Sequence, residues 1–182
     1  MGPDAVRSAL FAATESLCNA SPPGSVTIGQ IAEAADVDPK SVDRYFPSKD
    51  ELLAATMFRV EEQFLRLIKG IEDPAEAIGR FFDELNDRPT YPRLLNWMLL
   101  EGMDPTEQLE GFPFLERLVS MIGAATRPSE GQFRTQALIA FMAGWATTHD
   151  FTCRAAGLDE DELQQCTDWG REQAVLIALG DH

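Results

Sequence analysis

Apolar residues along this chain recur at spacings of three and four, which is the pattern of helices that bury one face. A helix predicted over residues 3–19 shows this spacing in Val6, Leu10, Ala13 and Leu17. The signals of strands are missing, because no Asn-Gly or Asp-Gly turn separates runs of alternating apolar and polar residues. The pattern therefore predicts an all-α fold.

Polar residues mark the starts of the next two helices. Thr27 and Gln30 have the spacing of a capping box, which opens a predicted helix over residues 28–35. Asp38 and Pro39 open the following helix, because aspartate is a strong N-cap and proline fits the first helical position without losing a needed donor. Two short helices joined by a tight turn are therefore expected.

A longer helix is predicted behind a second capping box, the sequence Ser-Lys-Asp-Glu at positions 48–51. Its apolar spacing continues to Ile71, which gives a length of about 36 Å at 1.5 Å per residue, enough to join two domains. Glycine and proline punctuate the rest of the chain. Further helices are predicted from Pro74, from Pro92, from Pro105 with a break near Gly111 and Pro113, and over residues 129–156 and 159–179.

Composition restricts the class of protein. With 182 residues and 45% apolar content the chain can fill a sizeable core, whereas its net charge of −15 argues against broad attraction to nucleic acids or anionic membranes. Three widely spaced cysteines without a CxxC pair indicate neither a disulfide framework nor a zinc site. No export signal or membrane-spanning run is visible, so we expect a cytoplasmic protein.

Residues 27–46 have helix-turn-helix spacing. Ala32 falls where two helices must approach closely, Asp36 follows at the turn, and Val37 and Val42 supply apolar contacts beneath the second helix. With YFPSKDELL directly behind it, the segment resembles the DNA-binding domain of the TetR family of bacterial transcriptional regulators, through the motif IAxxAxV followed by YFxSKxxLL. The alternative is an ordinary three-helix packing unit without a DNA role.

The resemblance covers about residues 6–53 and implies two domains. Residues 1–50 would form an N-terminal three-helix, helix-turn-helix DNA-binding domain. A long helix would join it to a helical ligand-binding and dimerisation domain in residues 51–182. The implied partners are double-stranded operator DNA, a small-molecule effector and a second copy of the chain, without a membrane and without a cofactor.

The resemblance also implies which residues meet DNA. Lys40, Tyr45 and Lys49 hold phosphate-contacting positions in the family. Helix amino termini add to this contact, because their free amides and dipole attract phosphate. The full set of expected DNA-binding residues is Thr27, Lys40, Ser41, Asp43, Arg44, Tyr45 and Lys49.

The segment departs from the family in its charge. Asp36 stands where glycine is usual, although aspartate is among the few residues that tolerate a left-handed turn. Asp43 replaces a frequent aromatic residue, and Arg7 alone represents the usual basic arm. Between Thr27 and Lys49, three basic and four acidic residues leave a net charge of −1. Two interpretations of Asp43 stay open: it accepts from a cytosine amino group in the major groove, or it points to solvent.

The last two helices are the candidates for dimerisation, because reading a palindromic operator needs two recognition helices about 34 Å apart, or a multiple of that distance. The run ALIAFMAGW, residues 137–145, is apolar all round and predicts a helix buried on opposite faces. A stripe on the final helix has small residues at its middle and resembles the family's four-helix dimer interface. It consists of Leu163, Cys166, Gly170, Ala174 and Ile177.

Large apolar side chains gather in the middle of the chain and can line a pocket between helices. The predicted lining residues are Trp97, Phe114, Phe141, Trp145 and His149. For each of them the alternative is ordinary core packing, because periodicity cannot tell a core from a cavity wall. His149 and Cys153 are one helical turn apart, but two ligands are too few for a metal site, and no metal is expected.

Three classes of function can be compared. The favoured one is a ligand-responsive DNA-binding transcriptional regulator, a repressor released from a palindromic operator by a small apolar or aromatic effector. The alternative is a TetR-like helical dimer with weakened DNA binding that acts as a sensor or through a protein partner. An enzyme is disfavoured, because the sequence contains no phosphate loop, nucleophile elbow, HExxH motif or grouping of Cys, His and Asp.

Overall fold

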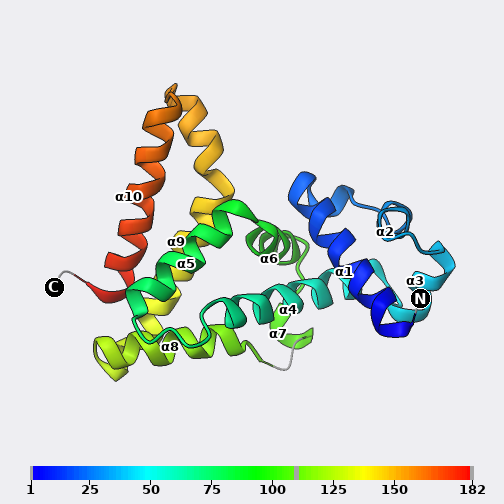
Figure 1. The fold of residues 1–182 in the computed structure, drawn as a ribbon, viewed down its shortest axis with the longest axis horizontal. Helices are drawn as coiled ribbons and strands as arrows, with labels where there is room; N and C mark the ends of the chain where they lie inside the picture. Colours follow the sequence, from blue (N-terminus) through cyan, green and yellow to red (C-terminus); the bar gives the residue numbers. More distant parts are fainter. Residues whose placement is uncertain (1, 109–110, 181–182) are drawn as a thin grey trace. The chain divides into compact units, whose positions relative to one another are not determined.

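The computed structural model describes residues 2–108 and 111–180, and in that part of the chain it contains helices and no strand (Figure 1). The predicted all-α fold is therefore confirmed. No helix in the described residues is long and apolar enough to cross a membrane. The helices are α1 (Pro3–Ala20), η1 (Pro23–Ser25), α2 (Ile28–Ala34), α3 (Pro39–Tyr45), α4 (Lys49–Leu67), α5 (Pro74–Asp87), α6 (Thr90–Leu100), α7 (Pro105–Gln108), α8 (Pro113–Ala125), α9 (Pro128–Ala156) and α10 (Glu160–Leu179).

The chain divides into two compact units. Unit 1 comprises Met1–Glu61 and Arg93–Gly111, and unit 2 comprises Glu62–Pro92 and Phe112–His182. The chain thus passes between the units three times: within α4, within α6, and between α7 and α8. The domain boundary at residue 50 stays a prediction, because compactness alone does not identify a functional domain.

Unit 1 contains the predicted helix starts with their caps formed. The Thr27 hydroxyl accepts from the Gln30 amide at 3.2 Å, and the Gln30 side-chain oxygen accepts from the Thr27 amide at 2.9 Å. The Asp38 carboxylate accepts from the Lys40 amide at 2.8 Å, and Asp36 adopts a φ of 54° at the turn between α2 and α3. The helix-turn-helix is confirmed as a local structure.

The long helix α4 is shorter than its apolar spacing predicted. It begins after Ser48, whose hydroxyl accepts from the Glu51 amide at 3.1 Å, but it ends at Leu67 and not at Ile71. Gly70 has a φ of +81°, so the chain leaves the helical conformation and Ile71 is buried from a turn instead. The helix has 19 residues, and its length is about 28 Å at 1.5 Å per residue.

Several other helix starts differ slightly from the prediction. The helix predicted from Pro92 begins at Thr90, and Pro92 lies in its first turn. The helix from Pro105 ends at Gln108, and Pro113 starts a separate helix, where it costs no hydrogen bond. The two final helices match their predicted bounds within one residue, and Gly157 ends α9 in the left-handed conformation.

Unit 2 has α9 at its centre. It packs against α8, α10 and α5, and α10 also packs along α5 (Figure 1). Helix α5 buries Ile78, Phe81, Phe82 and Leu85. One face of α9 is buried through Leu138 and Met142, whereas burial of the opposite face, which the all-round apolar run also predicted, stays a prediction.

The predicted stripe on α10 faces α9 of its own chain. Gly170 is buried so closely against α9 that an added Cβ would lie 2.4 Å from Cη2 of Trp145. Ala174, one turn further, is fully buried. Gly170 and Ala174 are therefore covered within the chain, although the sequence assigned them to the partner, because periodicity identifies a buried face without identifying what covers it. Dimerisation through the last two helices stays a prediction. The large apolar side chains that α9 and α10 leave exposed are Phe133, Phe151, Trp169 and Leu176.

A close backbone approach in unit 2 joins α8 and α9. A Cβ added to Gly131 would lie 2.8 Å from Cα of Gly123 and 2.8 Å from the Val119 carbonyl oxygen. A Cβ on Gly123 would meet its nearest neighbour, Cα of Pro128, at 3.5 Å, which is an ordinary contact. The two glycines of one interface thus differ in the space that they offer.

We predict that Gly131→Ala lowers the free energy of unfolding by about 1–3 kcal/mol, because the extra methyl group must push two backbones apart. Gly123→Ala is the matched control and should be neutral or stabilising by up to about 1 kcal/mol, through its higher helix propensity. Urea unfolding followed by circular dichroism measures both values. Equal effects of the two substitutions would contradict the assigned helix contact.

Candidate functional site

The exposed surface of α3 is the candidate DNA interface. Lys40, Asp43 and Arg44 are exposed, whereas Val42 is fully buried beneath them. Asp43 makes no hydrogen bond or ion pair with any described residue. The three exposed charges of α3 are therefore available to an external partner.

The remaining predicted DNA residues have other surroundings. Ser41 and Tyr45 are half-buried on the side of α3 that faces an open hollow of about 280 Å³. Thr27 is exposed, and its hydroxyl is engaged in the capping box of α2. Asp38 is occupied as the N-cap of α3, as the sequence predicted. The hollow is lined by Val6, Val37, Asp38, Ser41, Arg44 and Tyr45.

Lys49 has partners inside unit 1. Its ammonium group donates to the Gly24 carbonyl at 3.0 Å and lies 5.5 Å from the ring centre of Trp97. A cation over an indole ring is stabilised by the ring's quadrupole. Lys49 therefore joins the start of α4 to the η1 turn and to α6, which sequence spacing could not reveal.

The part of α6 in unit 1 also holds the end of α1. The Arg93 guanidinium donates to the Cys18 carbonyl at 3.3 Å and to the Asn19 carbonyl, both at the carboxyl end of α1. These carbonyls lack partners within their own helix, and a cation there also complements the helix dipole. Burial raises the pKa of the Cys18 thiol to about 11, although the nearby charges of Lys49 and Arg93 lower it. The thiol is therefore protonated at neutral pH.

The five predicted pocket residues occupy three places. Trp97 belongs to unit 1, with Lys49 against its ring. Phe114 is fully buried in unit 2, where its ring centre lies 4.5 Å from Phe81 and 5.3 Å from Phe64. This packing corresponds to the core alternative for Phe114.

Phe141, Trp145 and His149 come together on α9. The Trp145 and His149 rings stack at 4.4 Å between centres, and Phe141 lies 5.8 Å from Trp145. The Trp145 indole NH donates to the Asn86 side-chain oxygen at 3.1 Å, which fixes the ring against α5. These three residues therefore form one aromatic cluster, the α9 cluster, with a polar edge.

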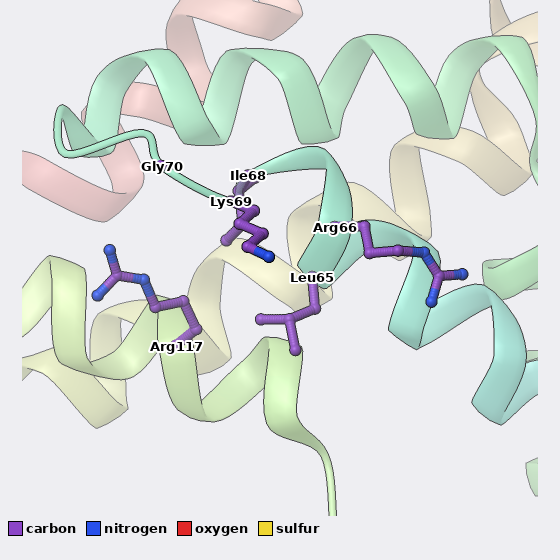
Figure 2. A pocket seen from close by; sticks show the side chains of 6 residues that line it. All are labelled: Leu65, Arg66, Ile68, Lys69, Gly70 and Arg117. Carbon is purple, nitrogen blue, oxygen red and sulfur yellow. The ribbon is translucent and has the colours of Figure 1, made fainter.

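An open pocket of about 490 Å³ lies in unit 2 between the end of α4 and α8 (Figure 2). Figure 2 shows Leu65 and Lys69 in the middle of the view and Arg117 at the left. The side chain of Arg66 points to the right, away from these residues. Leu65 and Ile68 supply its apolar wall, whereas three basic residues surround it in a strongly acidic chain. We call it the basic pocket; it is lined by Leu65, Arg66, Ile68, Lys69, Gly70 and Arg117.

One group of residues in the described part of the chain could hold a metal ion. His149, Cys153 and Cys166 each offer a ligand atom, and these atoms lie within 4.8 Å of one another. The sequence identified the His149 and Cys153 pair but missed Cys166, because that residue comes from the next helix. Desolvation raises the pKa of the Cys153 thiol, and the adjacent Cys166 thiol raises it further.

Sequence comparison relates the chain to bacterial regulators. The family profile described as "Bacterial regulatory proteins, tetR family" matches residues 10–56, the region of the helix-turn-helix. A helix-turn-helix transcriptional repressor of Mycobacterium tuberculosis, Rv3405c, is 26% identical over 90% of this chain and 85% of its own. The regulator TcmR of Streptomyces glaucescens is 29% identical over 70% of this chain and 56% of its own.

Solved structures share the whole fold. A transcriptional regulator of Streptomyces coelicolor superposes with a TM-score of 0.66 at 21% identity, over 95% of this chain and 96% of that one. The regulator FadR of Bacillus subtilis, solved in complex with stearoyl-CoA, gives a TM-score of 0.66 at 14% identity, over 96% and 99% of the two chains. The helix-turn-helix region thus matches the tetR family of bacterial regulatory proteins, and the whole chain shares the fold of solved bacterial transcriptional regulators.

Proposed function

We propose that this regulator is a ligand-responsive repressor, which binds a palindromic operator as a homodimer and leaves it when a small molecule binds. The observation that carries the proposal is the exposed, charged surface of α3, a helix that follows the turn and is capped by Asp38. Such a helix can enter the major groove with its side chains directed at base edges and phosphates. The relative Rv3405c, which is named a repressor, supports repression as the direction of regulation.

The local charge of α3 supports DNA binding despite the acidic chain. Lys40 and Arg44 are basic and Asp43 is acidic, so the charged residues of α3 itself sum to +1. Asp38 is engaged in its cap. Lys40 and Arg44 would contact phosphate, and Asp43 would accept from a cytosine amino group, which gives selectivity without high general affinity.

Dimerisation through the last two helices is proposed on the large apolar side chains that they leave exposed. Phe133 and Phe151 are 74% and 67% exposed on α9, and Trp169 is 56% exposed on α10, although each is large and apolar. Leu176 lies two turns beyond Trp169 and is also exposed. Large apolar side chains gathered on one face mark an interaction site, and a two-fold axis would bury them against themselves.

The effector is proposed to bind unit 2. The α9 cluster offers aromatic faces, and the basic pocket offers an open apolar space with the cations of Lys69 and Arg117. An apolar or aromatic effector that carries an acidic group would use both kinds of contact at the basic pocket. A ligand that changes unit 2 can alter unit 1 through the three chain crossings, which include α4 and α6.

The alternative function is that of a helical dimer with weakened DNA binding, acting as a sensor or through a protein partner. One observation favours it: Lys49, which the family resemblance assigns to phosphate, is already engaged with Gly24 and Trp97. A gel shift with the DNA upstream of the protein's own gene separates the two functions. Specific retardation supports the repressor, whereas equal weak binding to random DNA supports the alternative.

We predict that Lys40→Ala lowers the affinity for operator DNA and for random DNA by the same factor, because a phosphate contact carries no base information. The slope of log affinity against log salt concentration should become shallower by about 1. Asp43→Asn is the companion change at an equally exposed position of α3. It should relax selectivity at one base pair by about 1–3 kcal/mol. A uniform gain on all DNA would instead mean that Asp43 only repels phosphate.

We predict that Trp169→Glu weakens the dimer by at least about thirtyfold, the effect of losing one central apolar contact worth about 2 kcal/mol. Analytical ultracentrifugation over a range of concentrations measures it. Leu100→Glu is the control, because Leu100 is equally apolar and 87% exposed but lies on α6. A Trp169→Glu protein that stays as dimeric as the control would exclude α10 from the interface.

We predict that effectors found among apolar and aromatic compounds change the fluorescence of Trp145 in a variant that keeps only this tryptophan (Trp97→Phe, Trp169→Phe). These effectors should also lower the affinity of the protein for operator DNA. Operator DNA should lower the affinity for the effector by the same factor, because linkage is reciprocal. A variant that keeps only Trp97 reports on unit 1 as the control. Compounds that bind but leave operator affinity unchanged would refute induction.

One further variant locates the effector. Lys69→Gln removes a cation of the basic pocket and should weaken acidic compounds that bind there. Compounds that perturb Trp145 and do not respond to Lys69→Gln would bind at the α9 cluster instead.

A further inference from the structure

The turn between α9 and α10 brings two thiols and an imidazole together. His149 and Cys153 are one turn apart on α9, and Cys166 faces them from α10. The Cys153 sulfur lies 3.4 Å from Nδ1 of His149 and 4.0 Å from the Cys166 sulfur. All three ligand atoms fall within 4.8 Å of one another.

The surrounding hydrogen bonds fix which histidine nitrogen can bind a cation. The Thr167 hydroxyl donates to the Leu163 carbonyl at 3.0 Å, so its oxygen is free to accept from Nε2–H of His149 at 3.3 Å. The proton on Nε2 leaves the lone pair on Nδ1, which lies toward Cys153. Metal-bound histidines usually donate their second ring nitrogen in this way, and Trp145 holds the ring plane by stacking.

The distances suit a tetrahedral ion. With metal–sulfur bonds of about 2.3 Å and a metal–nitrogen bond of about 2.0–2.1 Å, tetrahedral geometry separates two sulfurs by about 3.8 Å and a sulfur from a nitrogen by about 3.6 Å. The observed separations are 4.0 Å and 3.4 Å. These two separations therefore need to change by only about 0.2 Å, whereas the separation of His149 and Cys166, which is within 4.8 Å, can need to shorten by up to about 1.2 Å.

We propose that His149, Cys153 and Cys166 form a binding site for a thiophilic d¹⁰ cation, Zn²⁺ or Cu⁺. Thiolate and imidazole ligands select these soft and borderline ions over Mg²⁺ and Ca²⁺, which prefer oxygen. Cys153 is buried, whereas His149 and Cys166 are half-buried, so the ion has a route from solvent. Zn²⁺ would keep a fourth, open position, and Cu⁺ would be complete with three ligands.

A disulfide between Cys153 and Cys166 is the competing use of these thiols. It would require the sulfurs to move from 4.0 Å to about 2.0 Å, far more than the ion requires. A cation site would also join α9 to α10 close to Gly157, on the two helices that expose Phe151 and Trp169. The bound ion would thus stabilise the helix pair proposed to carry the dimer.

The test uses the full-length protein, reduced and freed of metal by a chelator. Zn²⁺ is titrated against a fluorescent zinc indicator and Cu⁺ against a chromogenic copper(I) chelator, which separates the two ions. We expect one equivalent per chain, a rise in melting temperature on binding, and a thiolate-to-cobalt charge-transfer band when Co²⁺ replaces Zn²⁺. Absence of binding by both ions, or zinc binding without that band in the cobalt form, would overturn the site.

Variants identify the ligands. Cys166→Ser, Cys153→Ser and His149→Gln should each lower affinity at least about tenfold and remove the metal-dependent rise in melting temperature. Cys18→Ser and His182→Gln are the controls and should bind normally; His182 lies outside the described residues. Unchanged affinity in Cys166→Ser would refute the site. These measurements contain no DNA, so their failure leaves the proposed repressor intact, and loss of operator binding leaves the metal site intact.

Discussion

The packing of α9 against its neighbours is the constraint on which the second unit depends. Gly131 allows α8 to approach at backbone distance, and Gly170 of α10 leaves room for the Trp145 ring. Each contact needs a missing side chain on one helix, because protein interiors are close-packed and have no spare volume. Once these contacts form, the aromatic cluster, the pair of thiols and the exposed apolar face have fixed places on one helix pair.

Charge has to be considered locally in this protein. The chain carries a formal charge of −15, yet α3 itself sums to +1 and three basic side chains surround the pocket between α4 and α8. An acidic surface suppresses nonspecific association with nucleic acid, so a small basic helix surface then has to select its target by geometry. The many acidic residues are therefore compatible with a protein that binds only a few specific DNA sequences.

The elements that the sequence predicted well depend on short-range chemistry. The caps at Thr27 and Asp38 need partners two or three residues away, so spacing alone identifies them. The contacts that it missed join distant segments: Lys49 with Trp97, and Cys153 with Cys166. Gly170 on α10 is a further example: the period of 3.6 residues indicated a buried face, but not that Trp145 of the same chain covers it.

Unit 1, which contains the helix-turn-helix, is discontinuous along the chain because it includes Arg93 and Trp97. Residues 93–111 belong to the same compact unit as the helix-turn-helix, and Arg93 satisfies carbonyls at the end of α1. A fragment cut after α4 would lose that capping cation and the ring beneath Lys49. Exchange of this unit between such regulators, in evolution or by engineering, therefore has to transfer two separate chain segments. A single crossover would leave the transferred helix-turn-helix without the contacts of Arg93 and Trp97.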